Sequence, residues 1–206
     1  MTTGADVTEY EDFLGHWFYE TCFRDRVSIL DIGPGRCWFT RQNPKDIVAL
    51  DMEPEIVELY KGQGIRIELG SVYDIPFDDG TFDGVFCCWL FEHLTEPEKA
   101  ATQIGRVLRV DGYSRIIVPS AHSLMRGFYD DYARVRPFTT TSLVQMGRLA
   151  GFHQVRVQYL SWDRGSRQIL HWFGRPALLR CFRFYDTVFR KSGIVNRDML
   201  MLEAWK

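Results

Sequence analysis

The sequence has 206 residues, with 25 lysines and arginines against 27 aspartates and glutamates, which gives a formal net charge of −2. This balance argues against a dedicated nucleic-acid binder, which usually carries a strong basic excess. The 46% of hydrophobic residues argues against disorder. The length fits a single domain, 1–206, that can bury its core without disulfide or metal staples.

The hydrophobic pattern predicts helices alternating with strands. A first helix is expected at about 9–25, within an amino-terminal segment 1–26, and Thr8 with Glu11 resembles a capping box. Strands are predicted at 27–32, 47–50, 65–69, 82–89, 113–118, 155–159 and 200–205, and further helices from Pro54 and at 97–108 and 140–150. About two helical turns fit between the first two strands. This alternation predicts an α/β, Rossmann-like three-layer sandwich, with a mostly parallel seven-stranded sheet and an antiparallel edge pair.

The amino-terminal residues lack the basic-then-apolar order of a secretory signal, and the longest apolar run, 85–91, is too short to cross a bilayer. The five cysteines are odd in number and include no CxxC pair, so neither a disulfide framework nor a zinc site is expected. We therefore expect a cytoplasmic protein with no bound metal, able at most to sit at a membrane surface.

A glycine-rich turn follows the first predicted strand. Asp31, Gly33 and Gly35 stand there, and ligands of open α/β sheets bind at the carboxyl ends of strands. An acid this close to the turn would repel a pyrophosphate but attract a cationic ligand. Trp38 occupies the third glycine position of the dinucleotide pattern GxGxxG, and no GK[ST] follows. A purely structural turn remains the alternative interpretation.

A second acid, Asp51, ends the second predicted strand, 20 positions after Asp31. A carboxylate in this place can accept hydrogen bonds from both hydroxyls of a ribose. A lone acid at a strand end is more often a helix cap or a solvated loop residue. Its pairing with Asp31 favours a nucleoside site.

The segment from Gly70 to Leu94, GSVYDIPFDDGTFDGVFCCWLFEHL, is the most informative stretch. Together with ILDIGPG at 29–35, its IPF, FD and EH elements resemble the class I methyltransferases that use S-adenosylmethionine (SAM), particularly the small single-domain group of ubiquinone and menaquinone methylases. The matching residues run from about 27 to 119, and a weaker similarity covers 136–152.

This resemblance implies SAM as the cofactor and S-adenosylhomocysteine (SAH) as its product. It assigns the SAM amino and carboxylate ends to Asp31 and the turn, the ribose to Asp51, and the adenine to the loop at Ser71. The cofactor-binding residues that we expect are Asp31, Gly33, Gly35, Asp51, Met52, Ser71, Val72 and Cys88. The sequence departs from the family at Cys37, which replaces a third glycine, and at Ser71, which replaces an acid.

Methyl transfer from a sulfonium is a direct displacement that depends on positioning and, for some acceptors, on a base. His93, after the fourth strand, is the first candidate for that base, and His122, after the fifth, is the second. A histidine bonded to backbone at a helix start is the structural alternative for His93. Segments 120–140 and 161–198 are expected to cover the acceptor.

The stretch 166–186 is basic and aromatic. It could cap the pocket, bind an acidic or prenylated substrate at a membrane surface, form a homodimer face, or simply pack on the sheet with its arginine heads in water. We therefore expect methyl transfer to a small-molecule or lipid-like acceptor. The alternatives are a SAM- or SAH-binding partner or regulatory protein without catalysis, and an oxidoreductase using a dinucleotide or nucleotide sugar, which Asp31 and Trp38 disfavour.

Overall fold

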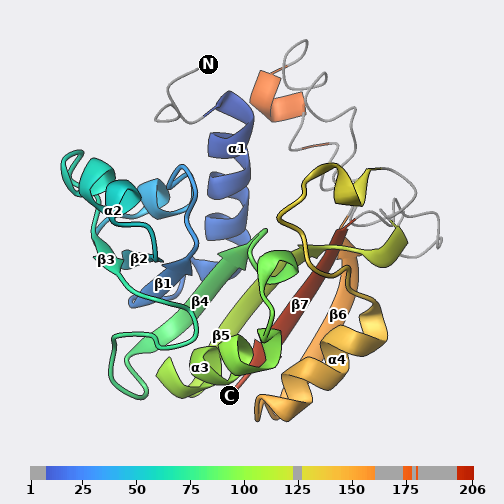
Figure 1. The fold of residues 1–206 in the computed structure, drawn as a ribbon. Helices are drawn as coiled ribbons and strands as arrows, with labels where there is room; N and C mark the ends of the chain where they lie inside the picture. Colours follow the sequence, from blue (N-terminus) through green and yellow to red (C-terminus); the bar gives the residue numbers. More distant parts are fainter. Residues whose placement is uncertain (1–7, 123–126, 161–173, 178–179, 181–198) are drawn as a thin grey trace.

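The computed structural model describes residues 8–122, 127–160, 174–177, 180 and 199–206 (Figure 1). Within them a single sheet has the strand order β3-β2-β1-β4-β5-β7-β6. Its members are β1 (Ile29–Ile32), β2 (Ile47–Asp51), β3 (Ile67–Leu69), β4 (Phe82–Cys88), β5 (Leu108–Pro119), β6 (Gln154–Leu160) and β7 (Met199–Trp205). The pairs from β3 to β5 are parallel, whereas β7 runs antiparallel to both β5 and β6. The predicted α/β architecture with its antiparallel edge pair is confirmed.

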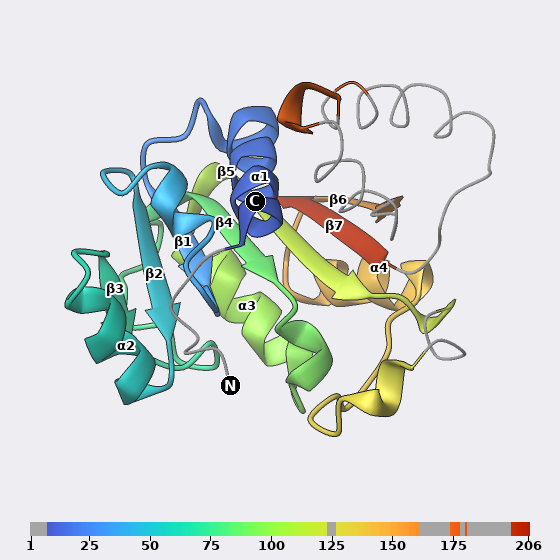
Figure 2. The same cartoon turned by 90° about the horizontal axis from the view of Figure 1, so that it is seen from above.

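Helices cover both faces of this sheet. Helix α1 (Glu9–Phe18) lies on one side, while α3 (Pro97–Val107) and α4 (Thr140–Leu149) lie on the other (Figure 2). Helix α2 (Pro54–Lys61) packs Val57 and Tyr60 beside Ala49 of β2. The side chains of a strand alternate between the two faces of the sheet, and helices cover both faces. The central strands are therefore buried on both sides, and every residue of β1 and β4 is buried.

The first helix ends differently from the prediction of a single helix over 9–25. The capping box at Thr8 is confirmed, but α1 gives way to a π-helix, Tyr19–Phe23. Phe18 and Phe23 are both fully buried and both contact Phe86, with ring centroids 5.4 and 5.9 Å away. A spacing of five residues suits the i→i+5 pitch of a π-helix, which aligns both rings with one partner.

Two other boundaries also differ from the sequence-based expectation. Strand β5 begins at Leu108 rather than 113, because a register shift in its pairing with β4 lets Leu108 pair with Phe82. The two helical turns expected between β1 and β2 reduce to a 3-10 helix, Thr40–Gln42. In the described part of the chain, no helix combines the length and the apolar character needed to cross a membrane.

Candidate functional site

The carboxyl ends of β1 and β2 bring Asp31 and Asp51 to one edge of the sheet. Asp31 pairs with Ala49 in parallel register, and Asp51 lies two residues farther along β2. Paired residues of parallel strands share a face and side chains alternate along a strand, so both carboxylates point to the same face. The charge of Asp51 also raises the pKa of Asp31, which shows that the two groups interact.

Asp31 is a buried acid with only 2% of its surface exposed. Burial raises the pKa of its carboxyl to about 7, and the charge of Asp51 adds to this. A hydrogen bond of 2.6 Å, donated by the Thr40 hydroxyl, acts in the opposite direction. Such a carboxyl is half-protonated near neutral pH and gains its full charge when a cationic group binds next to it.

The turn after β1 requires left-handed backbone at three positions. Gly33, Gly35 and Cys37 have φ angles of +65°, +54° and +56°. A Cβ at Gly33 would lie 3.3 Å from Leu90 Cδ2, whereas no atom lies within 4 Å of the corresponding point at Gly35. The backbone at Gly35 is therefore approachable by a ligand. Cys37 has the left-handed conformation that a glycine favours, although it carries a side chain.

The loops beyond β2 and β3 hold the other residues expected near a nucleoside. Asp51 is half-buried and its Oδ1 accepts a hydrogen bond of 3.0 Å from the Glu53 amide. Met52 is 67% exposed, and Val72 is buried. Ser71 Oγ accepts a hydrogen bond of 3.1 Å from the Tyr73 amide, so this hydroxyl already stabilises its own loop.

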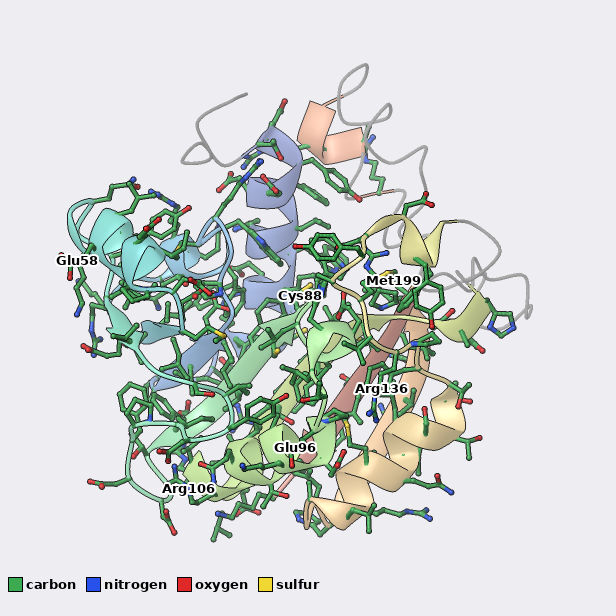
Figure 3. All side chains as sticks on the ribbon, in the orientation of Figure 1. Glu58, Cys88, Glu96, Arg106, Arg136 and Met199 are labelled. Carbon is green, nitrogen blue, oxygen red and sulfur yellow. The ribbon has the colours of Figure 1, made fainter. Side chains whose placement is uncertain are left out.

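The segment that follows β4 folds over the glycine-rich turn. Cys88 ends β4 in a buried position (Figure 3), and burial raises the pKa of its thiol. The Trp89 ring then lies 6.3 Å from the Trp38 ring, and Leu90 packs on Gly33. The residues after Leu90 consequently lie next to the turn that carries Gly33.

The two candidate bases occupy different surroundings. His93 ends a 3-10 helix, Phe91–His93, and its Nε2 lies 4.0 Å from Oε1 of Glu92. His122 is exposed beyond β5 and its ring packs edge-on against Tyr159 of β6, with centroids 5.8 Å apart. Glu92 belongs to the EH element of the sequence but is not among the residues predicted for the site. An acid within an otherwise apolar run was the available signal.

The described part of segment 120–140, which is predicted to cover the acceptor, contacts the residues after β4. The Val135 amide donates a hydrogen bond of 2.7 Å to the Glu92 carbonyl, and Phe128 is buried. The expected cap 161–198 and the basic aromatic stretch 166–186 lie outside the described residues, apart from 174–177 and 180. Within that short piece, Arg175 forms an ion pair with Asp12 of α1.

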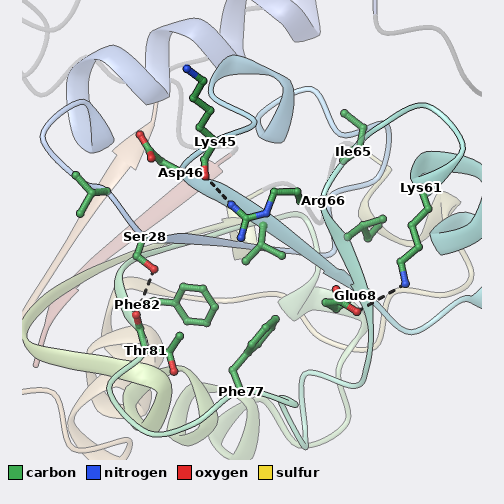
Figure 4. A pocket seen from close by; sticks show the side chains of 13 residues that line it. Ser28, Lys45, Asp46, Lys61, Ile65, Arg66, Glu68, Phe77, Thr81 and Phe82 are labelled. Atoms are coloured by element: carbon green, nitrogen blue, oxygen red, sulfur yellow. Dashed lines mark hydrogen bonds and ion pairs between the residues drawn. The ribbon is translucent and has the colours of Figure 1, made fainter.

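A cavity of about 340 Å³ opens at the opposite edge of the sheet, between the amino ends of β1, β2, β3 and β4 (Figure 4). Several of its charged side chains have protein partners. Lys61 pairs with Glu68 at 3.7 Å, and the Arg66 guanidinium donates to the Lys45 carbonyl. The residues predicted for cofactor binding lie at the carboxyl edge, so this cavity is separate from them.

An open α/β sheet with a glycine-rich turn and two acids at adjoining strand ends defines a nucleoside-cofactor-binding protein of the Rossmann-like class. Comparison with known proteins narrows this class. Residues 30–116 match the family described as "Methyltransferase domain". Curated relatives and solved structures that are similar to the chain are named as methyltransferases, among them SAM-dependent ones.

Two curated relatives carry names from quinone biosynthesis. The chain is 24% identical over 175 residues to the chloroplastic 2-methyl-6-phytyl-1,4-hydroquinone methyltransferase 2 of Oryza sativa subsp. japonica, a match covering 75% of this chain and 50% of that protein. It is 25% identical over 223 residues to the demethylmenaquinone methyltransferase of Symbiobacterium thermophilum, covering 98% and 82%. The chain thus spans about half the length of the rice relative.

A solved structure shares the fold. A SAM-dependent methyltransferase of Thermotoga maritima, described as a possible histamine N-methyltransferase, superposes with a TM-score of 0.67 at 18% identity. The match covers 94% of this chain and 89% of that one. At this identity the similarity establishes a shared architecture, and the acceptor must be argued on other grounds.

Proposed function

We propose that this protein transfers the methyl group of SAM to a small, lipid-like acceptor of the prenylated quinol type. The observation that carries the proposal is the placement of Asp31 and Asp51 on one face at adjoining strand ends, next to a turn with left-handed glycines. The quinol class is favoured by the names of the rice and Symbiobacterium relatives.

The residues at the carboxyl edge fit the chemical groups of SAM. The Asp31 carboxylate would accept hydrogen bonds from the ammonium group, and the turn at Gly33 and Gly35 would donate backbone N–H groups to the carboxylate. Asp51 would accept hydrogen bonds from the ribose hydroxyls, while Val72 and the exposed Met52 would pack on the adenine. Cys88 closes the buried side of the same region at the end of β4.

Ser71 stands at the adenine end of the proposed site, where the family pattern has an acid. Its hydroxyl accepts a bond from Tyr73, and an oxygen of this kind can still accept a second hydrogen bond from the adenine amine. A neutral acceptor gives a weaker bond than a carboxylate, by roughly a factor of two. We therefore expect SAM affinity to depend mainly on Asp31 and Asp51.

When bound, SAM supplies a methyl carbon whose bonding electron pair leaves with the sulfonium sulfur. The protein contributes position, because holding an acceptor atom about 3–3.5 Å from that carbon can lower the barrier by several kcal/mol. His93 is the first candidate for a base, and its place on the segment that packs over Gly33 supports this role. His122 is the second candidate.

Isothermal titration calorimetry tests cofactor binding with SAM, SAH and NAD as separate ligands. We expect SAM and SAH to bind and NAD not to bind. Asp51→Ala should weaken SAM binding by more than about 1 kcal/mol, because a carboxylate–hydroxyl pairing is lost. Asp46→Ala is the matched control, since it removes an acid that precedes β2 at its opposite end. Equal dissociation constants for the two variants would contradict the assignment of Asp51.

Transfer is measured with a demethylated hydroquinone carrying a short prenyl tail, followed by mass spectrometry of the product. We expect one added methyl group per turnover and stoichiometric SAH. SAM binding without methylation across a panel of quinols, phenols and amines would instead indicate a SAM-binding partner or regulatory protein. Binding of NAD but not SAM would indicate the oxidoreductase alternative.

A further inference from the structure

Glu92 is a buried acid without the partners that burial demands. Its side chain has no exposed surface, and neither carboxylate oxygen has a hydrogen-bond partner within the described residues. An unpaired charge in such a position is costly, and buried polar groups are normally bonded. His93 lies close by, with its Nε2 4.0 Å from Oε1 of Glu92.

The backbone around Glu92 is firmly held. Its carbonyl accepts hydrogen bonds from the amides of Val135 and Arg136, at 2.7 and 3.3 Å. These contacts join the 3-10 helix after β4 to the segment that crosses above it. Glu92 therefore has a fixed place, although its carboxylate has no hydrogen-bond partner in the part of the chain that the structure describes.

Titratable groups from three elements surround this carboxylate. His93 adjoins it on the same 3-10 helix, and Arg134 and Asp131 approach from the crossing segment. Arg134 donates to the Phe128 carbonyl at 3.1 Å, and its Nε lies 3.7 Å from Asp131 Oδ2. The thiols of Cys87 and Cys88, on β4, complete the surroundings.

The balance of these groups sets the protonation of Glu92. Burial raises the pKa of the Glu92 carboxyl to about 7, while the backbone N–H of Glu92 and the nearby charges of His93 and Arg134 lower it and the charge of Asp131 raises it. The carboxyl can therefore exchange a proton near neutral pH.

The ring geometry assigns different tasks to the two nitrogens of His93. Nε2 is the nitrogen that faces Glu92. A carboxylate next to one ring nitrogen favours the N–H there and leaves the lone pair on the other nitrogen. Nδ1 is thus the atom of His93 that can take a proton from a third group.

We propose that Glu92 is a positioning residue, whose charge favours the Nε2–H tautomer of His93 and stabilises the positive charge that the ring gains as a base. This inference rests on the proposed function. As the acceptor atom gains its methyl group, its bond to hydrogen breaks and the bonding pair stays on the acceptor. The proton forms a new N–H bond with the Nδ1 lone pair. The resulting imidazolium lies beside the Glu92 carboxylate, an arrangement that follows the logic of a base oriented by a buried acid.

Nitrogen-15 NMR of the histidine rings in the full chain tests this without an acceptor. The chain has five histidines, and His93→Gln assigns the His93 signals by their loss. We expect the Nε2–H tautomer in the wild type and a His93 pKa about one unit higher than in Glu92→Gln, the size typical for an opposite charge at this distance. Glu96→Gln is the matched control, since it removes an exposed acid from the same segment, and should leave the titration unchanged.

Superimposable His93 titrations in the wild type and Glu92→Gln would overturn the proposal. If Glu92→Gln does not fold, the carboxyl carbon of Glu92 is titrated in His93→Gln instead. Loss of the His93 charge should raise the pKa of Glu92, and an unchanged value would equally overturn the proposal. A failure of the proposed function would look different: SAM and the quinol probe would not react, whereas the coupling between Glu92 and His93 would persist.

Kinetics provide a third test if the quinol probe is methylated. Glu92→Gln should lower kcat at least about tenfold and displace the pH profile, with KM for SAM unchanged, because only the base is affected. Glu92→Asp should restore part of the rate. An equal loss in both variants with an undisplaced pH profile would indicate a purely structural role.

Discussion

The protonation of Asp31 should control how tightly SAM binds. The ammonium group of SAM requires an ionised carboxylate, whereas burial raises the pKa of Asp31 to about 7. If only the ionised form binds, the apparent dissociation constant is multiplied by 1 + 10^(pKa − pH). This factor is roughly 11 at pH 6 and roughly 1.1 at pH 8, so affinity should improve about tenfold across this interval.

Calorimetric titration of SAM at half-unit steps from pH 6 to pH 8 measures this dependence. The Asp31→Asn variant is the internal test, because it keeps an acceptor for the Thr40 hydroxyl but cannot ionise. We expect weaker binding that no longer varies with pH. A wild-type affinity that is constant over the interval would refute the reasoning, as would an unaltered slope in the variant.

Three further predictions concern stability, each measured by chemical denaturation without ligand. Asp31→Asn should raise the free energy of unfolding by up to about 4 kcal/mol at pH 8 and by less at pH 5. The folded-state pKa of Asp31 lies above the ordinary value of 3.8, so the wild-type protein loses stability as the pH rises from about 4 to 7 and the buried carboxyl ionises, whereas the variant does not. An equal gain at both pH values would contradict this. Gly33→Ala should cost about 1–3 kcal/mol, since its φ of +65° disfavours a side chain and the new Cβ would crowd Leu90. Glu203→Ala should cost about 3–5 kcal/mol, because it leaves the buried Arg115 guanidinium without its carboxylate partner at 2.6 Å; a neutral result would show that Arg115 reaches another partner.

Much of the fold could be predicted from periodicity and turn residues. The strand before DIGPG, the helix beginning at Pro54 and the helix ending before Gly151 all follow local rules of spacing and capping. The switch to π-helical pitch at Tyr19 could not be predicted in this way. It depends on where Phe86 lies, and that is a tertiary contact.

In the site, too, some features follow from the sequence and others depend on tertiary contacts. The positions of Asp31 and Asp51 at strand ends follow from the sequence, because parallel strands align their carboxyl ends. The isolation of the Glu92 carboxylate could not be predicted, since it depends on the chain near Val135 closing over it. The left-handed conformation of Cys37 is likewise visible only in three dimensions, because residue type alone disfavours it.

A crystal structure of the protein with SAH is the most direct test of where the cofactor binds. We predict ribose hydroxyls within hydrogen-bond distance of Asp51, the amino group beside Asp31, and the amino acid carboxylate over the turn at Gly35. Density for SAH in the cavity at the amino ends of the strands, with Asp31 and Asp51 untouched, would contradict the account.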